Sequence, residues 1–302
     1  MSGRPASAEV PRLGPAAVGM LEGLARHRLL STAQLHELYT PRSSARWAQH
    51  LLGRLRRAGL AEVTRTPGGL GLWRLSRRGA AAIEPLAAET GERRRAVSPE
   101  QAAGPLREHT LAVNEAGIAF VRAARERGDE CGPLAWRHEV PHSLGRPPGQ
   151  RRTELLIADA QLTYQQNGPG EQVRFHYRFL ELDRATKGSE RLAAQLACYA
   201  RLFHRTLPAA DPLEEPEPAW AKLYPVFPAV LTVIAGQLPK RFERRRRTVL
   251  ELLAEDAELA TAPEVSISIC SLEELATRGP FAPIFRGVGE PAVAVDWLGG
   301  AE

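Results

Sequence analysis

The spacing of apolar residues in the first sixty positions of the chain predicts three helices. In the first, Val18, Leu21 and Leu24 recur at helical spacing and would share one face. The second begins with Ser31-Thr-Ala-Gln34, a capping box in which each end side chain can bond to the other residue's backbone N–H. The expected helices span residues 16–30, 31–39 and 43–58, with Ser43 as the cap of the third.

The third predicted helix carries two different faces. One is apolar and is expected to face a core: Trp47, Leu51, Leu55 and Ala58. The other is basic, with residues at i, i+4, i+8 and i+11: Arg46, His50, Arg54 and Arg57. A helix with this pattern buries one side and presents the other to solvent or to a partner.

Two strands are expected after the third helix, over residues 60–65 and 70–75. Pro67-Gly-Gly69 between them is a turn signal, and a further helix is expected from Arg77 to Glu84. Three helices followed by a hairpin are typical of a winged helix-turn-helix, whose third helix enters the major groove of DNA. The pattern therefore predicts a winged-helix domain over residues 16–90, after a disordered lead-in of residues 1–15.

The charge distribution favours double-stranded DNA as the partner of this domain. Residues 1–95 contain sixteen Arg, seven Glu and no Lys, whereas the net charge of the whole chain is only +5. A basic block of this kind suits a polyanion. The residues expected to contact DNA are Arg42, Ser43, Arg46, His50, Arg54, Arg57, Arg65 and Arg74. The alternatives are that the arginines form a solvated face, or that the domain binds protein. Trp47 and Trp73 are interpreted as core residues.

A polar stretch rich in Arg, Gly and Pro, residues 91–105, is the predicted linker to a second domain. After the linker, the pattern predicts three helices, over residues 106–127, 189–203 and 240–254. It also predicts five strands, over residues 136–140, 154–164, 172–183, 224–235 and 264–270. This order predicts an α/β fold, α+β for the chain overall. The domain is expected over residues 106–278, followed by a C-terminal tail of residues 279–302.

Cysteine usage and hydropathy bear on the compartment. The three cysteines are far apart and lack the spacing of a zinc site, which indicates free thiols in a reducing compartment. No apolar run approaches the roughly 20 residues that span a bilayer. We therefore expect a cytoplasmic protein without a membrane partner.

Three carboxylates in the second domain could form a metal site. Asp159 lies on an otherwise apolar strand, where a charge needs a partner. Glu181 and Asp183 share one face of the next strand, since side chains in a strand alternate with period two. If the two strands pair through the turn of residues 167–170, the three carboxylates approach one another and repel unless a cation bridges them. Oxygen ligands suit Mg²⁺ or Mn²⁺, so Asp159, Glu181 and Asp183 are the predicted metal ligands.

Two sequence runs resemble a known family. The runs Arg107–Asn114 (REHTLAVN) and Phe179–Thr186 (FLELDRAT), together with the winged-helix start, resemble the replication-relaxation proteins of actinobacteria, which are associated with plasmids and other mobile elements. The resemblance extends from about residue 15 to residue 205, and the second run is its most specific part.

The resemblance implies a second domain like the PD-(D/E)xK nucleases. Asp159 matches the Asp of that pattern, and Glu181 matches the acidic residue of its Glu-x-Lys. Asp183 stands where the pattern has Lys, which is a departure, and Lys187 or Arg184 would have to supply the positive charge. The resemblance thus implies a catalytic set of Asp159, Glu181, Asp183 and Lys187, with Glu115 or Glu139 as additional acidic candidates.

These patterns lead to one main hypothesis and one alternative. The main one is a DNA-binding protein of plasmid or mobile-element replication or transfer, whose nuclease-like domain cleaves DNA with a divalent metal. The alternative is a non-catalytic transcriptional or replication regulator with a decayed nuclease fold, which the missing lysine of the Glu-x-Lys pattern favours. A separate interpretation is that the charged residues at the end of this strand are salt-bridged surface residues: Glu181, Asp183, Arg184 and Lys187. A second copy of the chain and plasmid replication or transfer proteins are the further expected partners.

Two other features of the sequence bear on DNA contact and on covalent nicking. The run Arg244–Arg247 lies on an expected helix and forms either a solvated face or a second phosphate-contacting surface. No Tyr has the flanking His cluster that a Tyr relaxase needs, so covalent nicking is not inferred.

Overall fold

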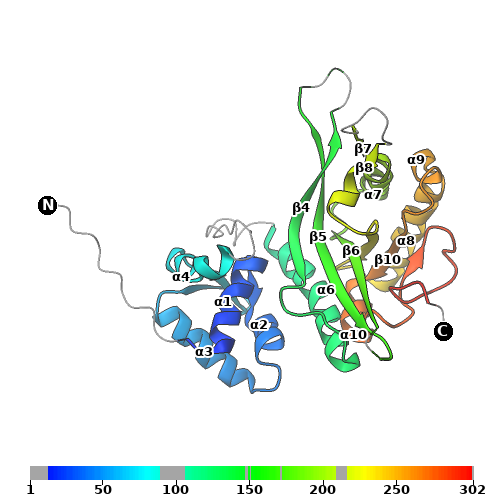
Figure 1. The fold of residues 1–302 in the computed structure, drawn as a ribbon. Coiled ribbons are helices and arrows are strands. Elements are labelled where there is room, and N and C mark those ends of the chain that lie inside the picture. The colour runs from blue at the N-terminus through cyan, green and yellow to red at the C-terminus, as the bar shows by residue number, and fades with distance from the viewer. Residues whose placement is uncertain are drawn as a thin grey trace. The chain divides into compact units, whose positions relative to one another are not determined.

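The computed structural model describes residues 13–88, 106–146, 149, 151–170, 172–208 and 216–300. The chain divides into two compact units, Met1–Asn114 and Glu115–Glu302 (Figure 1). The division falls inside helix α6 (Leu106–Arg127), which begins in the first unit and ends in the second. The predicted linker, residues 91–105, and most of the predicted lead-in lie outside the described residues.

The first unit combines helices with a three-stranded antiparallel sheet of order β1-β3-β2. Its elements are α1 (Pro15–His27), β1 (Leu30–Ser31), α2 (Thr32–Tyr39), α3 (Ala45–Arg57), β2 (Ala61–Arg65), β3 (Gly71–Leu75) and α4 (Arg77–Ala88). The three predicted helices, the hairpin and the following helix are thus confirmed, with ends shifted by a few residues. The α/β class predicted for the chain is also confirmed.

Local chemistry sets the start of α2 and α3. The capping box is present, since Ser31 Oγ accepts from the Gln34 N–H at 3.1 Å and Gln34 Oε1 accepts from the Ser31 N–H at 3.1 Å. The prediction that Ser43 caps α3 was wrong, because Ser43 lies in the preceding turn. Ser44 is the cap instead, and its hydroxyl accepts from the Trp47 N–H at 3.2 Å.

Two further corrections come from tertiary packing in this unit. The first helix ends at His27 rather than continuing to Leu30, because Leu30 pairs with Trp73 in the sheet. Trp47 is not a core residue and remains 45% exposed. The buried face of α3 is instead formed by Ala48, Leu51, Leu52 and Leu55. Trp73 is buried as predicted, and its indole N–H donates to Thr32 Oγ1 at 2.9 Å.

A mixed six-stranded sheet of order β11-β10-β9-β6-β5-β4 forms the second unit. The strands β4, β5 and β6 are antiparallel neighbours, whereas β6, β9 and β10 run parallel. The strands are β4 (Trp136–Gly145), β5 (Glu154–Asn167), β6 (Val173–Asp183), β9 (Ala229–Ile234), β10 (Ile267–Ser271) and β11 (Arg286–Gly287). The predicted strand at residues 136–140 is therefore longer than expected, and the one at residues 224–235 is shorter.

Helices connect the parallel strands and cover the sheet (Figure 1). Helix α7 (Ser189–His204) joins β6 to β9, and α8 (Pro239–Ala254) joins β9 to β10. The smaller elements are β7 (Thr206–Leu207), β8 (Glu217–Pro218), the 3-10 helix η1 (Ala219–Lys222), α9 (Ala257–Ala260) and α10 (Leu272–Arg278). The short strands β7 and β8 pair antiparallel with each other.

Hydrophobic cores form on both faces of the sheet. On one face, α7 and α8 bury residues such as Phe179, Leu196 and Val249. On the other, Phe120 of α6 packs edge-on against Tyr164 and Trp297, with ring centroids 6.4 and 5.1 Å apart. The segment from Gly279, expected from its composition to be a tail, thus contributes Trp297 to this core, where it is 3% exposed.

Two remaining expectations concern the compartment. Cys131, Cys198 and Cys270 are free cysteines, as predicted. Among the helices in the described ranges, none has both the length and the apolar character needed to cross a membrane.

Candidate functional site

Helix α3 presents the predicted basic face to solvent. Arg46, His50, Arg54 and Arg57 are all exposed, and the buried residues of the helix lie on its opposite side. Ser44 caps the N-terminus of the helix and satisfies one of its first N–H groups. The arrangement offers a row of cations on a rigid helix, which suits contacts with phosphates and base edges.

The other predicted DNA contacts of the first unit differ in accessibility. Arg42 and Ser43, before α3, and Arg65, at the end of β2, are exposed. Arg74 is only 13% exposed in its side chain and forms an ion pair with Glu62, its partner across the hairpin. Arg74 is therefore better placed to hold β2 on β3 than to meet a phosphate.

Sequence reasoning missed Trp47 as part of the α3 surface. Its indole ring stacks on the His50 imidazole, with centroids 6.0 Å apart and planes 16° from parallel. An exposed aromatic pair beside arginines adds an apolar, stackable surface to the basic face. Its signal was present, because Trp47 follows Arg46 directly and lies at the edge of the apolar stripe.

A buried Asn explains one of the two family-like runs. Asn114, at the end of the run Arg107–Asn114, is fully buried, and its amide donates to Leu29 O at 2.8 Å. Leu111 of the same run packs on Leu29 and Leu72. The described part of this run therefore has a structural role in the first unit.

Asp159, in the second unit, lies where strand β5 changes face. Leu156 and Ala158 belong to the core under α7 and α8, whereas Tyr164 packs on the opposite face with Phe120. Residues an even number apart share a face in a regular strand, so β5 must be irregular between these positions. Glu139 in the neighbouring strand β4 has a positive φ of 49°, which marks the same irregularity.

The irregularity ends the regular pairing of β5 with β6. Beyond that point the Asp159 carboxylate, rather than a backbone carbonyl of β5, accepts a hydrogen bond from the backbone of β6. Regular pairing of the two strands runs from Asn167↔Val173 to Ala160↔Leu180. Beyond it, the Leu182 N–H donates to Asp159 Oδ2 at 2.8 Å. Asp159 therefore stands beside the acidic end of β6, as the predicted pairing of the two strands implied.

Glu181 is buried and hydrogen-bonded at both oxygens. It is 2% exposed, accepts from the Tyr199 hydroxyl at 2.5 Å and accepts from the Gln195 amide at 2.9 Å. Gln195 Oε1 in turn accepts from Lys187 Nζ at 3.1 Å. Tyr199 and Gln195 both lie on α7, so Glu181 ties this helix to the centre of the sheet.

Burial raises the pKa of Glu181 well above its ordinary value of 4.5. The negative charge of Asp159 raises this pKa further, while the hydrogen bonds from Tyr199 and Gln195 and the charge of Lys187 lower it. A buried carboxylate beside a second carboxylate is stabilised either by a proton or by a cation. A proton or a divalent metal ion would therefore stabilise the neighbouring carboxylates of Asp159 and Glu181.

Asp183 is neutralised by an arginine from a distant helix. It is 5% exposed, and its Oδ2 accepts from Arg245 Nε of α8 at 2.5 Å. Its Oδ1 accepts from the Ala185 N–H at 3.0 Å. Both oxygens of Asp183 thus have partners that position α8 and the turn after β6.

The predicted triad is consequently not one cluster. Within the described residues, no group of three or more His, Cys, Asp or Glu side chains is arranged to hold a metal ion. The structure brings Asp159 and Glu181 together and directs Asp183 to Arg245. The metal and catalytic roles of Asp159, Glu181, Asp183 and Lys187 stay predictions.

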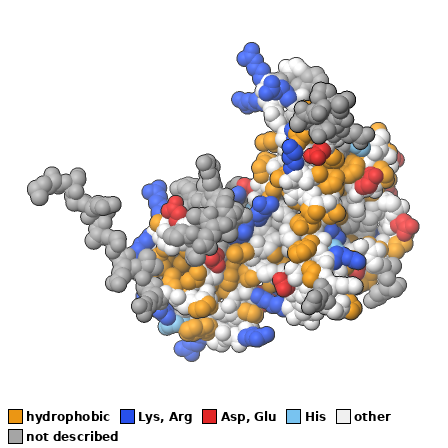
Figure 2. Space-filling view, viewed as in Figure 1, with side chains coloured by type: hydrophobic (Ala, Val, Ile, Leu, Met, Phe, Trp, Pro, Cys, Tyr) orange, Lys and Arg blue, Asp and Glu red, His pale blue; other side chains and the backbone are white. Residues whose placement is uncertain are grey.

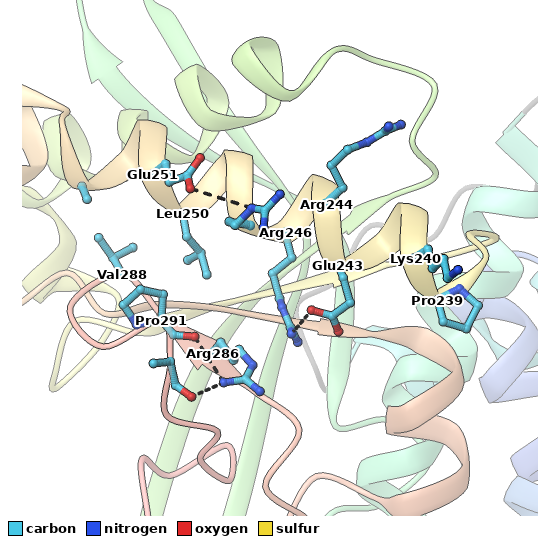
Figure 3. A pocket seen from close by; sticks show the side chains of 13 residues that line it. Pro239, Lys240, Glu243, Arg244, Arg246, Leu250, Glu251, Arg286, Val288 and Pro291 are labelled. Atoms are coloured by element: carbon cyan, nitrogen blue, oxygen red, sulfur yellow. Dashed lines mark hydrogen bonds and ion pairs between the residues drawn. The ribbon is translucent and has the colours of Figure 1, made fainter.

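The second unit has other surface features away from Asp159 and Glu181. Hydrophobic side chains are visible along the long strands β4 to β6, and Lys or Arg side chains stand at the end of the β4–β5 hairpin (Figure 2). Arg146, Arg151 and Arg152 are exposed near this end. A cavity of about 750 Å³ between α8 and residues 286–292 has an apolar floor that includes Leu250 and Val288 (Figure 3). Arg244, Arg246 and Arg247 of the run Arg244–Arg247 are among its lining residues, whereas the predicted metal ligands and α3 residues are not.

Comparison with known proteins gives one match. A family model described as replication-relaxation matches residues 21–211, more than half of the 302-residue chain. The match includes the α3 surface and the carboxylates of β5 and β6, and it ends before α8. No curated protein sequence and no solved structure matches the chain. The description of the family points to a role in replication or relaxation, and the chain belongs to the replication-relaxation family.

Proposed function

We propose that this protein binds double-stranded DNA and acts in the replication or relaxation of plasmid or mobile-element DNA. The first unit would be a winged helix whose third helix, α3, enters the major groove. The exposed row Arg46, His50, Arg54 and Arg57, opposite the buried face of α3, carries this proposal. The order of helices and strands in the unit supports it, because it is the order of winged helix-turn-helix domains.

A salt titration of duplex binding tests the proposal. Phosphate contacts release counterions, so the logarithm of the binding constant should fall linearly with the logarithm of the salt concentration, with a slope of about −0.9 per contact. With four to six cations of the first unit in contact, we expect a slope of about −4 to −5. A flat response, or no binding, would instead favour a first unit that binds protein.

The second candidate function is divalent-metal cleavage of DNA by the second unit. The observation that favours it is the buried pair Asp159 and Glu181, whose mutual repulsion a metal ion would relieve. These two side chains would hold Mg²⁺ or Mn²⁺, and Lys187, linked to Glu181 through Gln195, would provide positive charge nearby. Such an ion supplies an activated water and neutralises charge on the phosphodiester.

Cleavage of supercoiled plasmid separates this candidate from its alternative. If the second unit is a nuclease, the wild type nicks or linearises plasmid with Mg²⁺ or Mn²⁺, and both Asp159→Asn and Glu181→Gln lose at least about 100-fold in rate. Exposed Glu190→Gln is the matched control and should cleave as the wild type does. If the wild type binds plasmid without cutting it, the protein is a non-catalytic regulator and the carboxylates are structural.

A further inference from the structure

The four consecutive arginines of α8 do not form one surface. Arg246 is buried, forms an ion pair with Glu243 and lies 4.9 Å above the Phe242 ring. Arg247 is exposed and lies 3.9 Å from Glu251. Arg244 points to the other side of the helix from Arg246 (Figure 3). The run therefore combines structural and accessible cations, a distinction that the sequence alone does not make.

Arg244 and Arg245 of this run, together with Arg241 one turn earlier, line a polar cavity of about 340 Å³. Its walls come from one face of α8, from the turn after β6, from the start of α7 and from the turn after β9. The lining residues are Ala185, Ser189, Gln237, Arg241, Arg244, Arg245 and Thr248. Three are arginines and none is acidic. The volume falls at the lower end of the range that small ligands occupy, about 300 to 1,000 Å³.

The arginines of this cavity are positioned but not all neutralised. Arg245 is held by Asp183 and by the Lys187 carbonyl, to which its Nη2 donates at 2.9 Å. Its guanidinium has further N–H donors beyond these two bonds. Arg241 and Arg244 are exposed and form no ion pair with any residue of the described ranges. The cavity thus combines one fixed guanidinium with two cations that lack a counter-charge there.

The cavity lies beyond the carboxyl ends of the parallel strands β6 and β9, at the start of the helix that follows β6. Ser189 is the first residue of α7, and the cap residue Gly188 has no side chain to satisfy the first N–H groups of this helix. The dipole of α7 adds to the positive field of the arginines, and the carboxylate of Glu190 in the first turn of the helix opposes part of it.

We propose that this cavity binds a phosphate group. Arg241, Arg244 and Arg245 would pair with its oxygens, and the hydroxyls of Ser189 and Thr248 would donate to them. The phosphate is either part of a DNA backbone or part of a small phosphorylated molecule. The site belongs to the second unit and lies on residues beyond the matched family region except for Ala185 and Ser189, so it does not depend on DNA docking by α3.

Hydrogen exchange of the full-length protein, followed by mass spectrometry, tests this site. Peptides that cover residues 185–192 and 237–248 should exchange about tenfold more slowly when the cavity is filled. The two ligands are a short DNA duplex and inorganic phosphate at constant ionic strength. Slower exchange with the duplex alone identifies the DNA backbone as the source, and slower exchange with inorganic phosphate identifies the small anion.

Two double variants of α8 with equal loss of charge provide the control. Arg241→Gln with Arg244→Gln removes two cations from the cavity, whereas Lys240→Gln with Arg247→Gln removes two exposed cations that do not line it. The first should abolish the protection by either ligand and, if DNA is the source, lower the salt slope of duplex binding by about one to two units. The second should keep both properties.

Failure of this site is distinguishable from failure of DNA docking by α3. Loss of duplex binding in an α3 variant, with phosphate protection of the α7 and α8 peptides intact, leaves the cavity proposal standing. No protection by duplex or phosphate, together with identical behaviour of the two α8 variants, overturns it.

Discussion

Replacing Arg46 and Arg54 together with glutamine should weaken duplex binding by about 100-fold or more at ~0.1 M salt. Both residues are exposed on the face of α3 opposite its buried residues. A side chain that contacts a base edge contributes about 1 to 3 kcal/mol, so two contacts account for this loss. If the two arginines contact phosphates instead, the salt slope should fall by about two units. Fluorescence anisotropy with a labelled duplex at several salt concentrations measures both.

The matched control removes two other arginines of the first unit. Arg56 and Arg77 are exposed, but Arg56 lies off the predicted face of α3 and Arg77 begins α4. Arg56→Gln with Arg77→Gln should lower the affinity about tenfold at most through the general loss of positive charge. Equal losses in the two double variants would mean that α3 does not dock on DNA in the proposed orientation.

Substitution of Trp47 separates apolar contact with DNA from electrostatic attraction to its phosphates. Trp47 is 45% exposed and stacks on His50, so Trp47→Ala removes apolar contact area without changing charge. On the proposed surface this change weakens binding and leaves the salt slope unaltered, because the slope counts phosphate contacts. The face of α3 would then carry two separable contributions, one electrostatic and one apolar.

The chain pattern predicted α2 and the body of α3 because their signals are local. Ser31 and Gln34 lie three residues apart, and their reciprocal bonds form whatever the rest of the chain does. Strand β1 could not be predicted in the same way. Leu30 continues an apolar helical pattern, and only its pairing with Trp73, far along the chain, makes it a strand. Local propensity is overridden there by tertiary pairing.

The assignment of Trp47 to the core failed for a geometric reason. An α-helix has 3.6 residues per turn, so a residue at the edge of an apolar stripe lies near the boundary between the buried and the exposed side. The sequence pattern alone does not decide on which side such a residue falls. Trp47 precedes the buried Ala48, and the adjoining elements cover Ala48, Leu51, Leu52 and Leu55 instead. The prediction that the basic face is exposed depended less on the exact boundary, because its four residues lie on the exposed side of the helix, away from the apolar stripe.

For the carboxylates, the period of the strand and the turn before β6 indicated that Asp159 and Glu181 would be close. The partners that determine their chemistry are distant along the chain and could not be found by pattern. Tyr199 lies 18 residues from Glu181, and Arg245 lies 62 residues from Asp183. The predicted alternative of salt bridges at the end of β6 therefore agrees with the structure for Asp183, although the pair is buried rather than on the surface.

Glu181 provides the second large effect, on stability rather than on binding. Replacing Glu181 with alanine should lower the free energy of unfolding by about 3 kcal/mol or more. The change leaves the buried Tyr199 hydroxyl and the Gln195 amide without their acceptor, and each unsatisfied group costs about 1 to 3 kcal/mol. The cavity left by the side chain adds to this cost. Denaturation by urea, with exposed Glu190→Gln as the control, measures the difference.

Glutamine at the same position should behave differently, because burial penalises the charge of Glu181 and not its shape. The pKa of Glu181 is raised above 4.5 in the folded protein, so its protonated form is favoured by folding. The contribution of this group to stability is therefore fully present below about pH 4.5 and is lost as the pH rises through the folded pKa. Glutamine does not titrate and keeps an acceptor for Tyr199. The Gln195 amide can turn to accept from it, at the cost of its exposed bond to Lys187.

At pH 8 we therefore expect the free energy of unfolding of Glu181→Gln to be equal to or higher than that of the wild type. The difference between the two proteins should shrink as the pH is lowered and become constant well below pH 4.5, where Glu181 is protonated in both the folded and the unfolded state. Urea denaturation at pH 5, 6, 7 and 8 follows this difference. If the wild type instead gains stability over the variant as the pH rises, Glu181 is held as a carboxylate in the folded state. Its charge would then be stabilised by the hydrogen bond from Tyr199 and by Lys187 more strongly than it is disfavoured by burial and by Asp159.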